Sequence, residues 1–241
     1  MPPSDVQQAQ EDTTARSYSL AFVMIAAAFV ACLILSNIIA VKLIVVFGMI
    51  LPAAVIIFPI SYIIGDVLTE VYGYRKTRTV IWLGFALNLF AVLAIWTGGL
   101  LPAAPVWDGQ SAYTKILGAT PRLLAASGIA YLVGEFSNSI IMAKMKVATR
   151  GKWLWSRTIG SSIVGQGLDS AVFITIAFAG LLPMPVLAQV IASQWLIKTG
   201  YEVLATPLTY LVVNFLKRRE QLDVFDTDIT FNPLAHHRHE R

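Results

Sequence analysis

Charged side chains are scarce in this chain of 241 residues, at 13% against about 25% in an average soluble domain. Cysteine occurs once, as Cys32, which excludes an intrachain disulfide. The three histidines, His236, His237 and His239, all lie among the polar C-terminal residues, so none is available inside the apolar stretches for a catalytic triad or a buried metal site. We therefore expect no enzymatic activity, no metal and no cofactor.

Apolar residues make up 56% of the chain and come in long blocks, which is typical of transmembrane helices. The alternation expected of a membrane β-barrel is missing. We predict an all-α integral membrane protein with six transmembrane helices, at about 19–41, 52–72, 79–97, 123–145, 155–181 and 187–216. They form one domain, 18–218, between a polar tail at 1–17 and another at 219–241.

Two connections stand out between these predicted helices. The stretch 41–51 is apolar but too short to span, which favours an interfacial or partly re-entrant connection. The loop 98–122 is the longest, and we expect a short interfacial helix within it.

Basic residues in the loops, in the tails and at the ends of the spans lie mostly on one side. That side carries twelve: Arg16, Arg75, Lys76, Arg78, Lys144, Lys146, Arg150, Lys152, Arg157, Lys217, Arg218 and Arg219. The other side carries two, Lys115 and Arg122. Because cytoplasmic loops are enriched in Lys and Arg, we expect a multi-pass membrane protein with both termini in the cytoplasm.

Five carboxylic acids lie inside the apolar stretches, where only two basic residues, Lys42 and Lys198, accompany them. The acids are Asp66, Glu70, Glu135, Asp169 and Glu202. A charge at the centre of a bilayer costs at least ~2.5–3.5 kcal/mol, so such residues usually face a protein interior or a wet cavity and have a function.

Asp66 and Glu70 are four residues apart and share a helix face. Glu70 is near the inner end, so we predict an ion pair with the following loop, which contains Arg75 and Arg78. Asp66 is deeper and next to Gly65, which favours a functional role for it.

Two further spans carry polar pairs: Glu135 with Asn138, and Gln166 with Asp169, each three residues apart. The second pair lies in a run of glycines and serines that allows helices to approach closely. A carboxylate and an amide on one face could form a hydrogen-bonding wall for a polar ligand, or an interhelical bridge.

Lys198 and Glu202 are four apart in the last span, and two interpretations stay open. They pair with each other, or Lys198 balances a carboxylate on another span and leaves Glu202 for a ligand. Asn37 could line a cavity or make a helix–helix hydrogen bond.

An excess of acids and amides favours a ligand rich in N–H donors, or a cation. A guanine-like base presents an N1–H and a 2-amino group that a carboxylate accepts together. Inorganic cations, protons and cationic vitamins fit the same set of side chains.

Several strings resemble the queuosine precursor transporter family: FPISYIIGDVLTEVYG from Phe58 to Gly73, GEFSN from Gly134 to Asn138, and GQGLDS from Gly165 to Ser170. The stretch from Lys198 to Pro207 also fits. The resemblance covers about 19–218 and implies a six-helix importer of 7-deazaguanines, mainly the 7-cyano and 7-aminomethyl bases and in some members queuine, for transfer RNA modification.

This resemblance implies a location in the inner membrane and a pocket formed by Asp66, Glu135, Asn138, Gln166, Asp169 and Lys198. Glu202 and Asn37 are further candidates for the site from their place in the spans. An aromatic ring, Phe58, Tyr62, Phe136 or Phe173, would stack on the base. The expected partners are the base and the lipid bilayer, not a nucleic acid, and a homodimer and energy-coupling subunits stay open.

Three alternatives remain. The first is the substrate-binding subunit of an energy-coupling factor transporter for a vitamin or purine-like base, with ATP hydrolysed by other subunits, because this chain contains no G-x-x-x-x-G-K-[ST]. The second, of another class, is an intramembrane aspartyl-type enzyme that uses paired carboxylates as acid and base. The third is a proton or cation channel.

Overall fold

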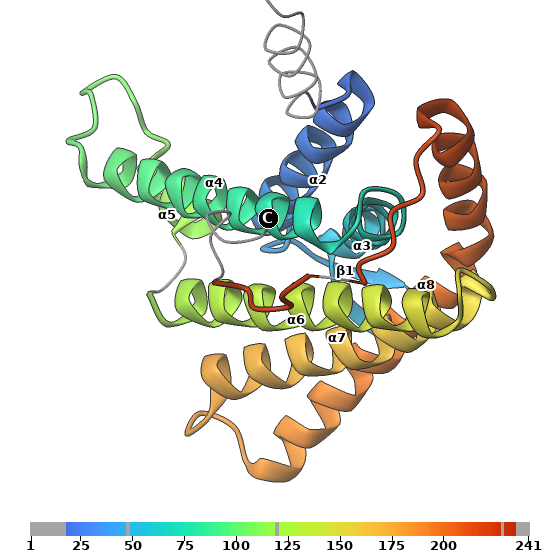
Figure 1. The fold of residues 1–241 in the computed structure, drawn as a ribbon. Helices are drawn as coiled ribbons and strands as arrows, with labels where there is room; N and C mark the ends of the chain where they lie inside the picture. The colour runs from blue at the N-terminus through green and yellow to red at the C-terminus, as the bar shows by residue number, and fades with distance from the viewer. Residues whose placement is uncertain (1–17, 47–48, 119–120, 228, 235–241) are drawn as a thin grey trace, which may run out of the picture.

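The structure is a computed structural model that describes residues 18–46, 49–118, 121–227 and 229–234. The expected tail at 1–17 and the histidines at 236, 237 and 239 lie outside these residues. The helices are α2 (Leu20–Ile39), α3 (Phe58–Val67), α4 (Tyr74–Leu100), α5 (Gln110–Leu117), α6 (Pro121–Ala148), α7 (Leu154–Phe178) and α8 (Met184–Glu220). Figure 1 shows α6 and α7 side by side, with α8 crossing toward α3.

Each of the six predicted spans coincides with a helical segment. The second is composite: η1 (Ala53–Ile56) is a 3-10 turn, α3 follows, and η2 (Leu68–Tyr72) is a π-helical turn. By length and hydropathy, four segments of the described chain are able to cross a membrane: α2, α4, α7 and the segment that takes in α5 and α6. The fold is therefore all-α and membrane-like, with long apolar helices.

The connections differ in how well the sequence predicts them. Within 98–122, α5 confirms the expected short helix. The stretch 41–51 was expected as an interfacial connection, and it contributes to an antiparallel hairpin, with β1 (Leu43–Val46) paired to β2 (Met49–Pro52).

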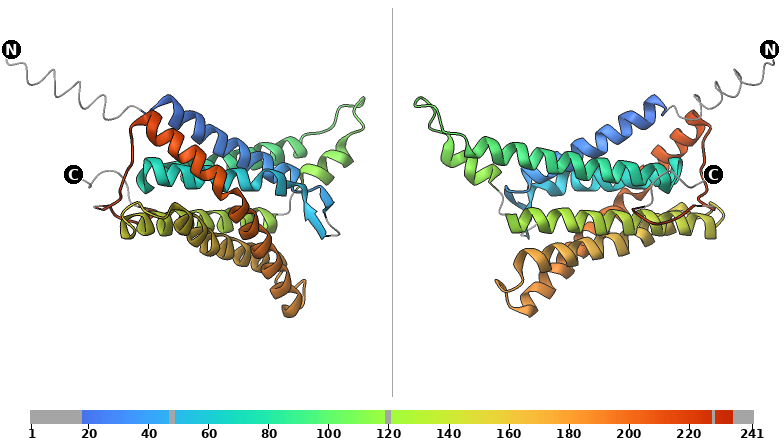
Figure 2. Two further views of the ribbon diagram at one scale, coloured as in Figure 1. Left: turned by 90° about the vertical axis from the view of Figure 1, so that its right-hand side faces the viewer. Right: turned by 60° about the vertical axis from the view of Figure 1, so that its left-hand side comes forward.

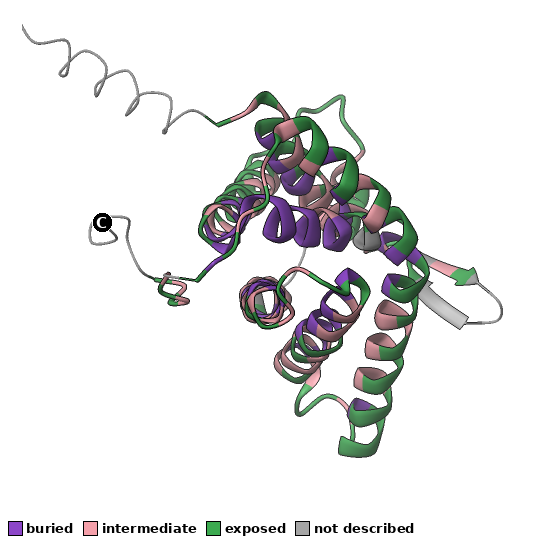
Figure 3. Cartoon of the chain, turned by 45° about the vertical axis from the view of Figure 1, so that its right-hand side comes forward, coloured by how far each residue is buried: buried purple, intermediate pink, exposed green. Residues whose placement is uncertain are grey.

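Figure 3 shows buried residues gathered where the helices meet and exposed residues on their outward faces. On α4 the exposed residues include Phe90 and Trp96, which suits a lipid-facing surface.

Helices α6 and α7 approach closely because each contributes a glycine to the crossing. A Cβ on Gly134 would lie 2.8 Å from Cβ of Asp169, and a Cβ on Gly165 would lie 2.7 Å from Cβ of Asn138. Each glycine therefore makes room for a polar residue of the other helix. The expected small-residue approach in the fifth span is confirmed, and it brings Asn138 and Asp169 to one interface.

The chain after α8 packs against the bundle. Residues 222–227 and 229–234, called the C-terminal strap below, run from the end of α8 beside α4 (Figure 2). Asp226 Oδ2 accepts a hydrogen bond of 2.8 Å from the backbone N–H of Tyr74, the first residue of α4. Trp82 Nε1 donates to the Pro233 carbonyl at 2.9 Å. Part of the predicted polar tail at 219–241 is thus tied to the helices.

Substituting Gly134 with alanine should destabilise the fold, because the new Cβ forces α6 away from α7. Overpacking of this kind typically costs ~1–3 kcal/mol, so Gly134→Ala should lower the midpoint of thermal unfolding in detergent. Gly200→Ala on α8 is the matched control, because a Cβ there meets nothing within 4 Å. Equal midpoints for the two variants would contradict the packing described.

Candidate functional site

Five buried polar side chains from four helices lie together inside the bundle. This buried polar cluster consists of Asp66 on α3, Glu135 and Asn138 on α6, Gln166 on α7 and Glu202 on α8, each at most 4% exposed. Asn138 Nδ2 donates to Asp66 Oδ1 at 2.9 Å, and Gln166 Nε2 donates to Glu202 Oε2 at 3.5 Å. Electrostatic interactions link Glu135 to Asp66 and to Glu202.

Each member of the cluster keeps one oxygen without a hydrogen-bond partner among the described residues. These atoms are Asp66 Oδ2, Glu135 Oε2, Asn138 Oδ1, Gln166 Oε1 and Glu202 Oε1. Most buried polar atoms in proteins are paired, so a group of unpaired ones needs an explanation. All five atoms are carboxylate or amide oxygens, which accept hydrogen bonds. The cluster therefore lacks hydrogen-bond donors for them.

Several buried hydroxyls on the same helices are also unpaired within the described part of the chain: Ser139 on α6, Ser162 and Ser170 on α7, and Thr199 on α8. The sequence interpretation did not include them in the site. Their signal in the sequence is weak, because serine and threonine in membrane helices usually bond to their own backbone or to a neighbouring helix.

Lys198 pairs with Asp169 on α7, with 2.6 Å between Nζ and Oδ2. Of the two interpretations left open by the sequence, this contact supports the one in which Lys198 balances a carboxylate on another helix. Asp169 and Lys198 are 14% and 21% exposed, so this pair lies closer to the surface than the cluster. Glu202 keeps an unpaired oxygen as a result.

The remaining predicted site residues have different positions. Tyr62 is buried on α3, one turn before Asp66, and interacts electrostatically with Glu135, Asp169 and Glu202. Asn37 on α2 donates to Asn88 Oδ1 on α4 at 2.8 Å, which is the helix–helix bond that the sequence left open.

The other aromatic candidates are not placed at the cluster. Phe136 packs on Trp82 and Phe173 on Phe178. The side chain of Phe58 lies outside what the structure describes. Among the four aromatic candidates, Tyr62 is therefore the one whose described interactions reach the acids.

Glu70 belongs to a separate ionic group at one end of the bundle. Its carboxylate is fully buried and accepts two 2.7 Å bonds from Arg157 on α7 and one of 2.6 Å from Lys217 on α8. Lys146 on α6 donates to the Glu70 carbonyl and to Asp223, both at 2.5 Å. We call these five residues the ionic latch.

The predicted ion pair of Glu70 therefore exists, but its partners differ from those expected. The chain reverses at Gly73, where φ is +81°, and α4 carries Arg78 toward the C-terminal strap. There Arg78 Nη1 donates to the Asn232 carbonyl at 3.1 Å. Glu70 instead meets basic residues that the sequence interpretation used only for orientation.

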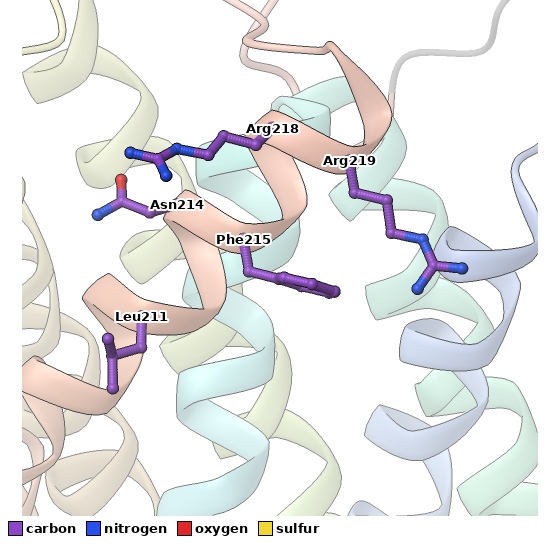
Figure 4. A pocket seen from close by; sticks show the side chains of 5 residues that line it. All are labelled: Leu211, Asn214, Phe215, Arg218 and Arg219. Carbon is purple, nitrogen blue, oxygen red and sulfur yellow. The ribbon is translucent and has the colours of Figure 1, made fainter.

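Two surface hollows lie apart from the cluster's residues. One runs along α8 and is lined by Leu211, Asn214, Phe215, Arg218 and Arg219, all from a single helix (Figure 4). The other, of about 280 Å³, lies between α2, α4 and α5 and includes Asn37 and Trp96. Phe29 on α2 packs at Gly65, beside Glu135 of the cluster. Asn37 is eight residues after Phe29, so Asn37 lies about 12 Å further along α2.

Apolar helices that enclose polar groups from several elements are typical of multi-span membrane proteins with a functional site in their interior. A family model described as "Putative vitamin uptake transporter" matches residues 52–212, which is more than half of the chain. The chain belongs to this family.

One curated relative agrees with this assignment. The "Probable queuosine precursor transporter" of Bacillus subtilis (strain 168) is 27% identical over 188 residues, covering 77% of this chain and 82% of the relative. No solved structure matches the chain significantly. A transporter family argues for a transporter and against the aspartyl-type enzyme considered from the sequence.

Substituting Glu70 with glutamine should strongly destabilise the protein. The change leaves Arg157 buried beside a neutral amide, and breaking a buried ion pair from one side typically costs ~3–5 kcal/mol. Asp108→Asn is the control, because Asp108 is exposed in the α4–α5 connection. Thermal unfolding and size-exclusion profiles in detergent measure the effect, and a Glu70→Gln protein as stable as the control would rule out the latch as a major source of stability.

Proposed function

We propose that this protein imports a 7-deazaguanine, a precursor of queuosine, across the inner membrane. The observation that carries the proposal is the set of five unpaired acceptor oxygens in the buried polar cluster. Lys198, the basic residue nearest in sequence to a member of the cluster, is paired with Asp169. A ligand that satisfies this cluster has to bring donors, and a 7-deazaguanine brings N1–H, a 2-amino group and a pyrrole N–H.

Roles for the individual residues follow from these contacts. The carboxylate of Glu202, Glu135 or Asp66 accepts the N1–H and 2-amino edge, since a carboxylate accepts two parallel donors in one plane. Gln166 and Asn138 can each turn an amide to meet the carbonyl edge of the base. Tyr62 offers a ring face. Asp169 and Lys198 form an ion pair at the border of the site. Asn37 lies further along α2, where it bonds to Asn88.

Six transmembrane helices with both termini in the cytoplasm fit this role. The composite segment of η1, α3 and η2 and the long α8 would supply the two spans beyond the four that length and hydropathy support. The excess of basic residues puts the latch, with Arg157 and Lys217, on the cytoplasmic side. Import would be passive or ion-coupled, with the base trapped by later metabolism.

The description of the family as vitamin uptake transporters favours one second candidate. In this alternative the same cluster binds a vitamin or purine-like base for an energy-coupling factor system, whose separate subunits hydrolyse ATP. Copurification of ATPase subunits would support it, whereas full uptake by the chain alone in a foreign host would exclude it.

Transport can be tested directly by restoring queuosine in transfer RNA. The chain is expressed in cells that neither synthesise queuosine nor import its precursors, each 7-deazaguanine is supplied, and transfer RNA is assayed. We expect queuosine to appear with at least one precursor. If the protein reaches the membrane and no precursor restores queuosine, the proposed function is wrong.

Glu202→Gln should lower the uptake of the transported base by about 10- to 100-fold, because a hydrogen bond to a charged group contributes ~1.5–3 kcal/mol and each ~1.4 kcal/mol is tenfold. Glu220→Gln makes the same exchange at the end of α8, outside the cluster, and should change uptake little. Initial rates are compared at equal amounts of protein in the membrane. Unchanged uptake by Glu202→Gln would remove Glu202 from the binding site.

A further inference from the structure

The ionic latch lies next to the buried polar cluster along the chain and along the bundle. Asp66 and Glu70 are four residues apart in one continuous helical segment, which corresponds to about 6 Å. The same elements carry both groups: α6 holds Asn138 and Lys146, α7 holds Gln166 and Arg157, and α8 holds Glu202 and Lys217. The latch therefore ties together the helices that enclose the cluster, at one end of it.

Exposure rises steadily through the latch toward that end of the bundle. Glu70, Arg157 and Lys146 are 0%, 1% and 2% exposed, Lys217 is 20% and Asp223 is 44% exposed. The latch thus reaches from the interior to the protein surface. The latch therefore lies between the cluster and the surface at this end.

Asp223 connects the latch to the C-terminal strap. Its Oδ1 lies 2.5 Å from Nζ of Lys146 and 2.8 Å from Nζ of Lys217. Partial burial raises the pKa of Asp223, but the hydrogen bonds from the two lysines outweigh burial and hold the pKa below its usual range. Asp223 is therefore ionised at neutral pH and bridges the two lysines.

The rest of the strap is held by hydrogen bonds and by a few apolar contacts, among them Phe231, whose ring lies 5.4 Å from that of Tyr74. Lys146 Nζ also donates to the Val224 carbonyl at 2.6 Å, Asp226 receives the N–H of Tyr74, and Trp82 donates to Pro233. Val224 and Asp226 also lie against Gly73, where a Cβ would come within 2.7 Å and 3.0 Å of their side chains. Within the strap only Asp226 is buried and the other described residues are half-buried or exposed, and segments with so little burial open at a lower free-energy cost than the helical core.

We propose that the ionic latch and the C-terminal strap form the gate on the strap side of the transport path. In the conformation described here, this gate is closed. The strap lifts from Gly73 and Tyr74, the bridge through Asp223 breaks, and the helices part at Glu70 so that the cargo leaves the cluster toward this side. The cargo is the 7-deazaguanine of the proposed function, on which this inference rests. The π-helical turn η2 is the element that changes conformation, since such turns recur at functional sites.

Accessibility of a buried position beside the cluster tests the gate without measuring transport. Ser139 is fully buried next to Asn138, and Cys32 is the single cysteine of the chain. Ser139→Cys is placed in a Cys32→Ser background, and its reaction with a membrane-impermeant maleimide is followed in inverted and right-side-out vesicles. Asp226→Ala removes the hydrogen-bond acceptor that fastens the strap to α4.

Asp226→Ala should raise the labelling rate by about tenfold, because the loss of one hydrogen bond to a charged group shifts an open–closed equilibrium by that factor. The increase should occur only from the side of the membrane that carries the strap. Trp82→Phe, which removes the donor to Pro233 and keeps a ring, should give a smaller increase from the same side. Asp108→Ala, an exposed acid outside the strap, should leave the rate unchanged.

Two results would overturn the gate: an unchanged labelling rate in both strap variants, or an increase from the opposite side. Thermal unfolding of each variant is measured in parallel, and a global loss of structure would make Ser139→Cys accessible from both sides, which also counts against the gate. Adding 7-cyano- or 7-aminomethyl-7-deazaguanine should slow the labelling of Ser139→Cys in the parent background. Failure of this protection by either base concerns the proposed function, not the gate.

Discussion

The shortage of hydrogen-bond donors and positive charges around buried carboxylates is the constraint on which the rest of the structure depends. Each carboxylate placed among apolar helices needs a cation, a set of N–H donors or a proton, because an unpaired buried charge is very costly. Glu70 meets this need within the protein through Arg157 and Lys217, and Asp169 meets it through Lys198. Asp66, Glu135 and Glu202 each keep an unpaired oxygen. The helix arrangement therefore divides the acids into a structural group and a group open to a ligand.

This division has a spatial order along the bundle. Glu70 is completely buried yet connected through Lys217 and Asp223 to the surface, whereas the cluster lies deeper among α3, α6, α7 and α8. The close approach of α6 and α7 at Gly134 and Gly165 places Asn138 and Asp169 at the same interface. The proposed site for a polar cargo and the proposed gate beside it thus involve the same few helices.

Much of the helical framework could be predicted from hydropathy alone, because a block of about twenty apolar residues is a local property. The six predicted spans coincide with helical segments, and the short helix in the long loop forms as α5. The hairpin of β1 and β2 was not foreseen, because a short apolar stretch of this length is compatible with several conformations. The packing of the C-terminal strap was not foreseen either, since its polar composition is also that of a free tail.

The sequence by itself determined that the chain is a helical membrane protein, that it buries more acids than bases, and that these acids favour a ligand rich in donors or a cation. Only the tertiary structure decided which acid has which partner. Glu70 and Arg157 are 87 residues apart, and Glu70 and Lys217 are 147 apart, so no local pattern could join them. Four-residue spacing made Glu202 a plausible partner for Lys198, but the crossing of α7 and α8 brought Asp169 to it instead. Pairing of buried charges depends on how the helices pack, and that is a long-range property of the folded chain.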